Sequence, residues 1–248
     1  VFVYGGMRNG EHLNDLWRFD LDGGNQRQIP IEDALKKPLH NPTMSSDGHR
    51  LFIGGDFDDV LFHVFVYSDG VIQPFTKIQT PMSVTLPGAK LVMYEENRGL
   101  VIGGEYSKSG MMNHSVYKVD ESGELCPTFT RGLVPARRSG HTVLLVKGMV
   151  VVYGGEENWK PCMLRLDTKS WCYLNSRKLK KITHFAGATD GERIYIHGGM
   201  CDLKKNCSLK IITLTVPEVS EKPADFPKNS PLIEIIADNH YVHDMGPV

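Results

Sequence analysis

The feature that most constrains the fold of this chain is a short apolar run that ends in two glycines and occurs five times. The five pairs are Gly5-Gly6, Gly54-Gly55, Gly103-Gly104, Gly154-Gly155 and Gly198-Gly199. Their first glycines are 49, 49, 51 and 44 residues apart. Chance does not place five such pairs behind β-branched or aromatic runs at a near-constant interval, even in a chain with 25 Gly. The chain is therefore built from repeats of about 50 residues.

The residue pattern within each repeat predicts four short antiparallel strands. Runs such as Leu51–Ile53 are short and rich in β-formers, which favours buried strands over helices. A second strand follows, and copies such as Leu16–Asp20 alternate apolar and polar residues. Turn signals such as Asp22-Gly23 lead to a third strand, and a fourth, innermost strand precedes each complete glycine run. One such sheet cannot bury both faces alone, whereas stacked sheets can, which predicts an all-β fold of β-propeller type.

Length and charge limit the classes of protein that fit. A single all-β domain can reach roughly 200–250 residues, so the 248 residues are expected to form one domain, 1–248. The formal net charge of −1 argues against a dedicated nucleic-acid binder and against a polybasic membrane surface. No apolar run approaches the roughly 18 residues of a membrane span. We therefore expect neither a membrane nor a nucleic acid among the partners.

The five cysteines indicate a reducing compartment. Their number is odd and their spacing irregular, which does not suit a disulfide framework. Reduced thiols are typical of intracellular proteins, so a cytoplasmic or nuclear location is expected. In a secreted protein, Cys201 and Cys207 could instead close a loop.

The chain begins inside a repeat, at the apolar run Val1–Tyr4, so we expect it to be a fragment of a longer protein. After residue 216 the pattern gives way to a segment, 217–248, that contains four prolines and one apolar strand, Leu232–Ile236. That strand either begins a sixth blade or returns to complete the first, and six blades are expected in the intact domain. The repeats span approximately 1–39, 40–86, 87–135, 136–182 and 183–216.

Several motifs resemble the kelch repeat, whose period is about 50 residues. They are Asn14-Asp15-Leu16-Trp17, Phe19-Asp20, Arg138-Ser139-Gly140-His141, Asp167 and Trp171. The resemblance covers residues 1 to about 214. It departs from the kelch pattern in that the Arg-Ser-Gly-His signature is intact only before the fourth glycine pair, and the outer-strand Trp is missing from most copies.

The resemblance implies a protein-binding function. Kelch propellers often serve as substrate-recognition domains of ubiquitin ligase adaptors, and they bind a partner peptide or surface with a loop-lined face. A non-ligase scaffold, cytoskeletal or chromatin-associated, is the alternative, and a kelch-fold enzyme is the third. The chain contains no P-loop, nucleophile elbow, zinc-protease helix or dinucleotide fingerprint, so neither an enzyme nor a cofactor is expected.

The loops after the glycine pairs and before the innermost strands are expected to share one rim and to bind the partner. The candidate residues in them are Arg8, His12, Asp56, Tyr106, Arg137, Arg138, Trp159 and His184. By resemblance, Arg138 would point into a central pocket and bind an acidic peptide through its guanidinium. Alternatively, it is a structural arginine that binds loop carbonyls. Trp159 is either an aromatic anchor for the partner or packs under its own loop.

Two groups of residues contain side chains of the kinds that bind metal ions. Asp56, Asp58 and Asp59 are acidic neighbours, but they lack the loop pattern that calcium requires. His240 and His243 have ligand-like spacing, but two histidines alone do not define a zinc site. No metal is expected.

Overall fold

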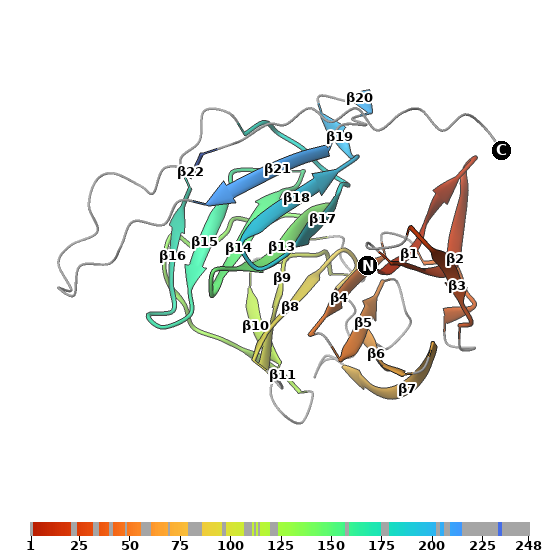
Figure 1. The fold of residues 1–248 in the computed structure, drawn as a ribbon. Helices are drawn as coiled ribbons and strands as arrows, with labels where there is room; N and C mark the ends of the chain where they lie inside the picture. Colours follow the sequence, from red (N-terminus) through yellow and green to blue (C-terminus); the bar gives the residue numbers. More distant parts are fainter. Residues whose placement is uncertain are drawn as a thin grey trace. The chain divides into compact units, whose positions relative to one another are not determined.

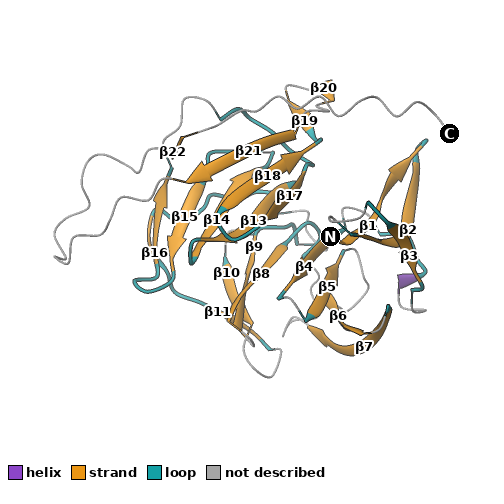
Figure 2. Cartoon of the chain, in the orientation of Figure 1, coloured by secondary structure: helices purple, strands orange, loops and turns teal. Residues whose placement is uncertain are grey.

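The computed structural model shows an all-β chain in which strands make up nearly all of the regular structure, with a short helical turn at Leu35 (Figures 1 and 2). The residues that it describes are 2–20, 24–31, 35–39, 42–47, 49–55, 61–68, 70–78, 86–95, 98–106, 111, 113, 115–119, 124–156, 159–174, 179–201, 204–205, 209–214 and 233–234.

Each repeat forms one small antiparallel sheet. The first sheet consists of β1 (Phe2–Arg8), β2 (Glu11–Phe19) and β3 (Gln26–Ile29). The second sheet consists of β4 (Thr43–Ser46), β5 (Arg50–Gly54), β6 (Phe62–Ser68) and β7 (Val71–Ile78). The third sheet consists of β8 (Lys90–Glu95), β9 (Arg98–Ile102), β10 (Val116–Val119) and β11 (Leu125–Pro127).

The remaining strands belong to the last two repeats. The fourth sheet consists of β13 (His141–Val146), β14 (Met149–Gly154), β15 (Cys162–Arg165) and β16 (Ser170–Tyr173), with β12 (Arg131–Gly132) parallel to β16. The fifth sheet consists of β17 (Ala186–Thr189), β18 (Arg193–His197), β21 (Leu209–Leu214) and β22 (Ile233–Glu234). A separate two-stranded ladder joins β19 (Met200–Cys201) and β20 (Lys204–Lys205).

These five sheets are the blades of a β-propeller, so the predicted all-β fold class is confirmed. In sheets two to five, the strand that precedes the glycine run forms one edge of the sheet beside the glycine strand, as predicted, whereas the first sheet begins with its glycine strand β1. The chain divides into two compact units. The first contains Val1–Phe129 and Arg137–Ser139 and carries sheets one to three, and the second contains Thr130–Ala136 and Gly140–Val248 and carries sheets four and five.

In the first unit, the second sheet is buried on both faces. Leu51 and Ile53 pack with side chains of the first sheet, whereas Phe52, between them on β5, packs with side chains of the third. This division follows from the pleat, which points successive side chains of a strand to opposite faces. The cluster on the first face contains Tyr4, Leu16, Ile29, Leu35, Leu39, Leu51, Ile53, Phe65 and Ile72.

In the second unit, one apolar cluster joins the fourth and fifth sheets. Its buried members are Val146, Met149, Val151, Tyr153, Met163, Leu174, Leu179, Ile182, Ile194, Ile196, Ile212 and Leu214. Burial of apolar surface is the main stabilising term of such a core, at roughly 25 cal/mol per Å² of apolar area.

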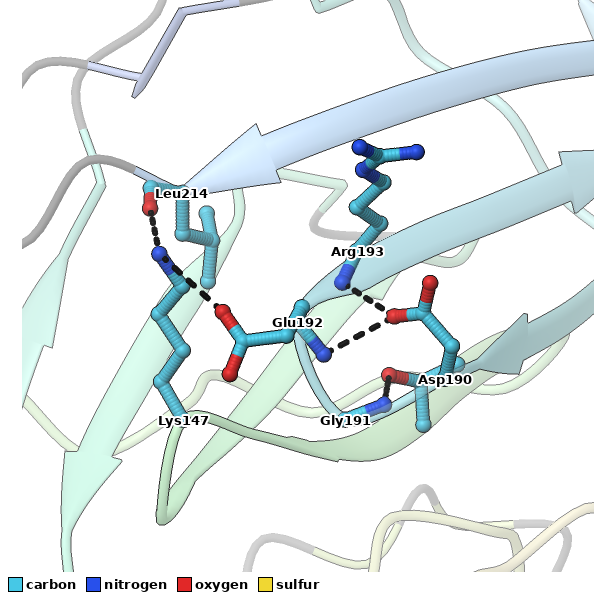
Figure 3. A network of polar contacts seen from close by, with 7 residues as sticks. Lys147, Asp190, Gly191, Glu192, Arg193 and Leu214 are labelled. Atoms are coloured by element: carbon cyan, nitrogen blue, oxygen red, sulfur yellow. Dashed lines mark hydrogen bonds and ion pairs between the residues drawn. The ribbon is translucent and has the colours of Figure 1, made fainter.

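A polar network joins the fourth and fifth sheets at the ends of the strands opposite the glycine pairs (Figure 3). The ammonium of Lys147 donates to the carbonyl of Leu214 at 3.1 Å and lies 3.6 Å from the carboxylate of Glu192. The backbone N–H of Lys147 donates to the carbonyl of Gly191 at 2.8 Å. The turn after β13 is thereby fixed to the turn before β18.

Asp190 shapes the second of these turns. Its carboxylate accepts the backbone N–H groups of Glu192 and Arg193 at 2.8 and 2.6 Å (Figure 3). The hydroxyl of Tyr195 donates to the same carboxylate at 2.7 Å. These hydrogen bonds stabilise the ionised form and lower the pKa of Asp190 to about 2.

Three details differ from the prediction. The first glycine pair lies inside β1, and the segment after it, where a loop is expected, is a β-hairpin that turns at Asn9-Gly10. A register shift between Tyr4 and Gly6 accommodates the pair within the ladder. Strand β12 was not predicted, because two residues carry no alternation.

The third difference concerns the C-terminal strand. Ile233 and Glu234 pair with Leu214 and Thr213 of β21, so β22 is the outer strand of the fifth sheet. It neither begins a sixth blade nor completes the first, which were the two predicted placements. Four hydrogen-bonded strands in the fifth sheet match the count in the second and third.

We predict that His63 makes stability depend on pH. Burial lowers the pKa of this β6 side chain from 6.5 to about 4, and Lys77, opposite it on β7, adds to the effect. The unfolded chain therefore binds the proton more tightly, and stability is lost as pH falls from about 6.5 to 4. Chemical denaturation should show that His63→Gln lacks about 3 kcal/mol of this loss in the free energy of unfolding. Equal pH slopes for the two proteins would contradict the assignment.

Candidate functional site

The loops next to the glycine pairs are held by backbone hydrogen bonds. The N–H of Gly155 donates to the carbonyl of Ile182 at 3.0 Å, and the N–H of Gly104 donates to the carbonyl of Arg138 at 3.1 Å. In both cases the second glycine of a pair bonds the segment that precedes an innermost strand. The residue after Gly104, Glu105, also donates to Pro87 at 2.9 Å. Loops fixed in this way can present side chains in a defined arrangement.

Only glycine fits at the tightest of these positions. A Cβ atom on Gly199 would lie 2.7 Å from the carbonyl oxygen of Thr183, and one on Gly104 would lie 2.9 Å from that of Pro87. Both glycines also have positive φ, +85° and +84°. The glycine run is thus required by the close approach of neighbouring backbone as well as by conformation.

We predict that Gly104→Ala and Gly199→Ala each destabilise the fold by about 2 kcal/mol or more, because strain and overlap with backbone add together. Gly191→Ala is the matched control, since Gly191 has a similar φ of +91° and nothing within 4 Å of a Cβ. It should cost only about 1 kcal/mol. Urea denaturation measures all three, and equal costs would show that close approach does not matter.

In the second unit, His184 lies at the centre of the most connected loop region. Its backbone N–H donates to the carbonyl of Gly140 at 2.9 Å, and its Nδ1 lies 3.0 Å from the hydroxyl of Thr183. Its Nε2 lies 3.5 Å from the carboxylate of Glu156, which follows the fourth glycine pair. Both side chains are partly exposed. The imidazole and carboxylate are therefore presented together to solvent.

Trp159 lies in the same loop as Glu156. Its carbonyl accepts the N–H of Gly154 at 3.2 Å, and its partly buried side chain packs against the apolar cluster of the fourth and fifth sheets. This favours the interpretation that Trp159 packs under its own loop, with part of the ring left accessible.

Met200 is a further exposed residue of this region. It follows the fifth glycine pair, forms two backbone hydrogen bonds with Thr183 at 3.1 and 2.8 Å, and is 38% exposed. Its exposure could not be predicted from the sequence, because an apolar residue after a strand has no pattern that separates a buried from an exposed position.

Arg138 is buried, whereas a residue that binds a partner must be accessible at the surface. Its side chain is 0% exposed, and it is one of the largest fully buried side chains described. Ser139 and His141 of the same motif are also buried. A peptide cannot reach this guanidinium in the present structure, so burial favours the structural role. Its neighbour Arg137 is exposed.

The candidates of the first unit lie on separate loops. Arg8 and His12 belong to the β1–β2 hairpin, where Arg8 is exposed and His12 partly buried. The hydroxyl of Tyr106 donates to the side chain of the buried Asn113 at 3.0 Å and lies 3.2 Å from that of Tyr117. Tyr106 is thus committed to a network that fastens its own loop.

The remaining predicted positions fall outside the described residues. These are Asp56 with its neighbours Asp58 and Asp59, and the pair His240 and His243. Within the described ranges, no three His, Cys, Asp or Glu side chains are grouped so that they could hold a metal ion. In the same ranges, no helix is long and apolar enough to span a membrane.

One titratable group was missed. Lys90 begins the innermost strand β8, and burial lowers its pKa to about 8. Nothing in a strand pattern distinguishes a lysine in this environment from one on a solvated face.

Comparison with protein-family models gives no match for this chain, and comparison with curated proteins also gives none. The kelch resemblance therefore depends on the repeat motifs. The five-bladed β-propeller architecture is seen in the structure itself and does not depend on this resemblance. This fold is consistent with a protein-interaction module.

Proposed function

We propose that this chain is a protein-interaction module that binds its partner through the loop surface of Glu156, Trp159, His184 and Met200. The observation that carries the proposal is the fixed backbone beneath these side chains. Gly155 bonds Ile182, and His184 bonds Gly140, so the loops of two sheets are tied together. A preorganised surface loses little conformational entropy on binding, which favours affinity.

The chemistry of this surface suits a polypeptide partner. It combines an aromatic ring and a thioether, which supply apolar contact, with an imidazole and a carboxylate, which supply polar contacts. Aromatic and methionine side chains are enriched in protein interfaces. The kelch resemblance supports binding over an enzymatic function.

The finer role that we propose is substrate recognition within a ubiquitin ligase, with the partner as the protein to be modified. The support for it is the kelch resemblance and the frequency with which kelch propellers serve in this way. The ligase-binding segment would then lie in the natural protein outside these 248 residues. A cytosolic or nuclear location accompanies the proposal.

The test is affinity purification of the natural full-length protein from its own cells. We expect His184→Ala plus Met200→Ser to reduce recovery of partners about tenfold, because both exposed contacts are lost. The control, Arg193→Ala plus Lys169→Ala, changes two exposed residues at the opposite strand ends of the same unit. Equal recovery from both variants would exclude this surface.

The same purification tests the proposed role in a ubiquitin ligase. Cullin-type scaffold subunits should be recovered with wild type and with both variants, because their binding does not use the loop surface. Recovery of actin or chromatin proteins, without ligase subunits, would instead support the scaffold alternative.

A further inference from the structure

A cluster of two arginines and one tyrosine lies in the first unit, at strand ends opposite the glycine pairs. The guanidinium of Arg18, on β2, donates to the hydroxyl of Tyr67, on β6, at 2.6 Å. The guanidinium of Arg27, on β3, donates to the same oxygen at 3.0 Å. Two cations from the first sheet therefore converge on one neutral atom of the second sheet.

The register of the β2–β3 ladder places the two arginines close enough to repel each other unless a negative charge lies nearby. Arg18 and Arg27 are directly opposite each other in the β2–β3 ladder, and like charges at such positions repel. Asp20 compensates only one of them, through an ion pair of 2.9 Å with Arg18. Within the described residues, no carboxylate forms an ion pair with Arg27. Among the described residues, one positive charge of the cluster therefore has no carboxylate partner.

The tyrosine ring is held in place for this role. Phe2 packs edge-on against Tyr67, with ring centroids 4.9 Å apart, and the guanidinium of Arg18 lies 5.5 Å from the ring centroid. A side chain at Gly70 would overlap the guanidinium of Arg27, because a Cβ there would lie 2.9 Å from its Cζ. The absence of a side chain at Gly70 leaves the space that Arg27 occupies.

The donors of the cluster match an oxyanion. A phenol oxygen has two lone pairs and one O–H. The two arginines use the lone pairs, so the O–H is directed elsewhere as a third donor. Each guanidinium also has five N–H groups in a planar fork, of which the tyrosine takes one. Arg18 and Asp20 remain partly exposed, with 38% and 46% of their side chains accessible.

We propose that Arg18, Arg27 and Tyr67 form a binding site for the phosphate monoester of a phosphorylated side chain on a partner protein. A phosphate dianion offers several acceptor oxygens and two negative charges, whereas a carboxylate offers two oxygens and one charge. The site lies on different sheets from the loop surface of the proposed function and does not depend on it.

The test is a titration of the 248-residue chain with N-acetyl-phosphoserine amide at constant ionic strength, followed through the arginine Nε–H resonances by NMR. We expect saturable shifts of Arg18 and Arg27. Arg27→Gln should weaken binding about tenfold, as expected for loss of a charge-assisted hydrogen bond. Arg98→Gln, which removes the same charge from an exposed arginine on β9, should leave the affinity unchanged.

A second variant is expected to bind the phosphate ligand more tightly, which provides a further check. Asp20→Asn removes the competing carboxylate from Arg18, so binding should strengthen about threefold. Tyr67→Phe keeps the ring but removes the hydroxyl, and it should weaken binding. Thermal denaturation without phosphate separates folding from binding: Arg27→Gln should not lower stability, because it relieves the repulsion from Arg18.

Three results would overturn the proposal. The first is a titration that does not saturate, or equal affinity for Arg27→Gln and Arg98→Gln. The second is equal binding of N-acetylglutamate amide, which would remove the preference for phosphate. The third is tighter binding of inorganic phosphate than of phosphoserine amide, which would identify free phosphate as the ligand.

Discussion

The hydrogen bond from the second glycine of a pair to the segment before an innermost strand is the interaction on which the loops depend. It is seen from Gly104 to Arg138 and from Gly155 to Ile182. Such a bond requires two backbones to approach more closely than any side chain allows. The conformation and the small size of glycine are therefore used together, and the exposed loop residues take their positions from this contact.

Burial on both faces is the second organising constraint. A four-stranded sheet in the middle of a stack has no solvated face, and β5 accordingly alternates between two apolar clusters rather than between core and water. This explains why the strands at the glycine pairs appear as continuous apolar runs. It also explains why the repeat can be recognised in the sequence: each copy forms a sheet that must bury apolar side chains against the neighbouring sheets.

The longer strands of each repeat could be predicted because they are specified by local pattern, and the glycine pairs mark their positions along the chain; two-residue strands such as β12 could not. The site could not be predicted as well, because burial of a polar residue is a property of the packed structure. Arg138 has the same local signature whether its guanidinium is exposed or enclosed. Arg18 and Tyr67 are 49 residues apart, and only the pairing of sheets brings them together.

The pairing of β22 with β21 has a consequence for folding. Among the strands of the first three sheets, and from β13 to β16 in the fourth, neighbours in the sheet follow one another closely in sequence, so these strands can pair by local hairpin closure. The last strand instead returns from Ile233 to Leu214, across 18 intervening residues, and closing that longer loop costs more entropy. We therefore expect the fifth sheet to acquire its outer strand last. Until then, β21 is an open sheet edge, which makes this the point at which a nascent chain is most prone to pair with another molecule.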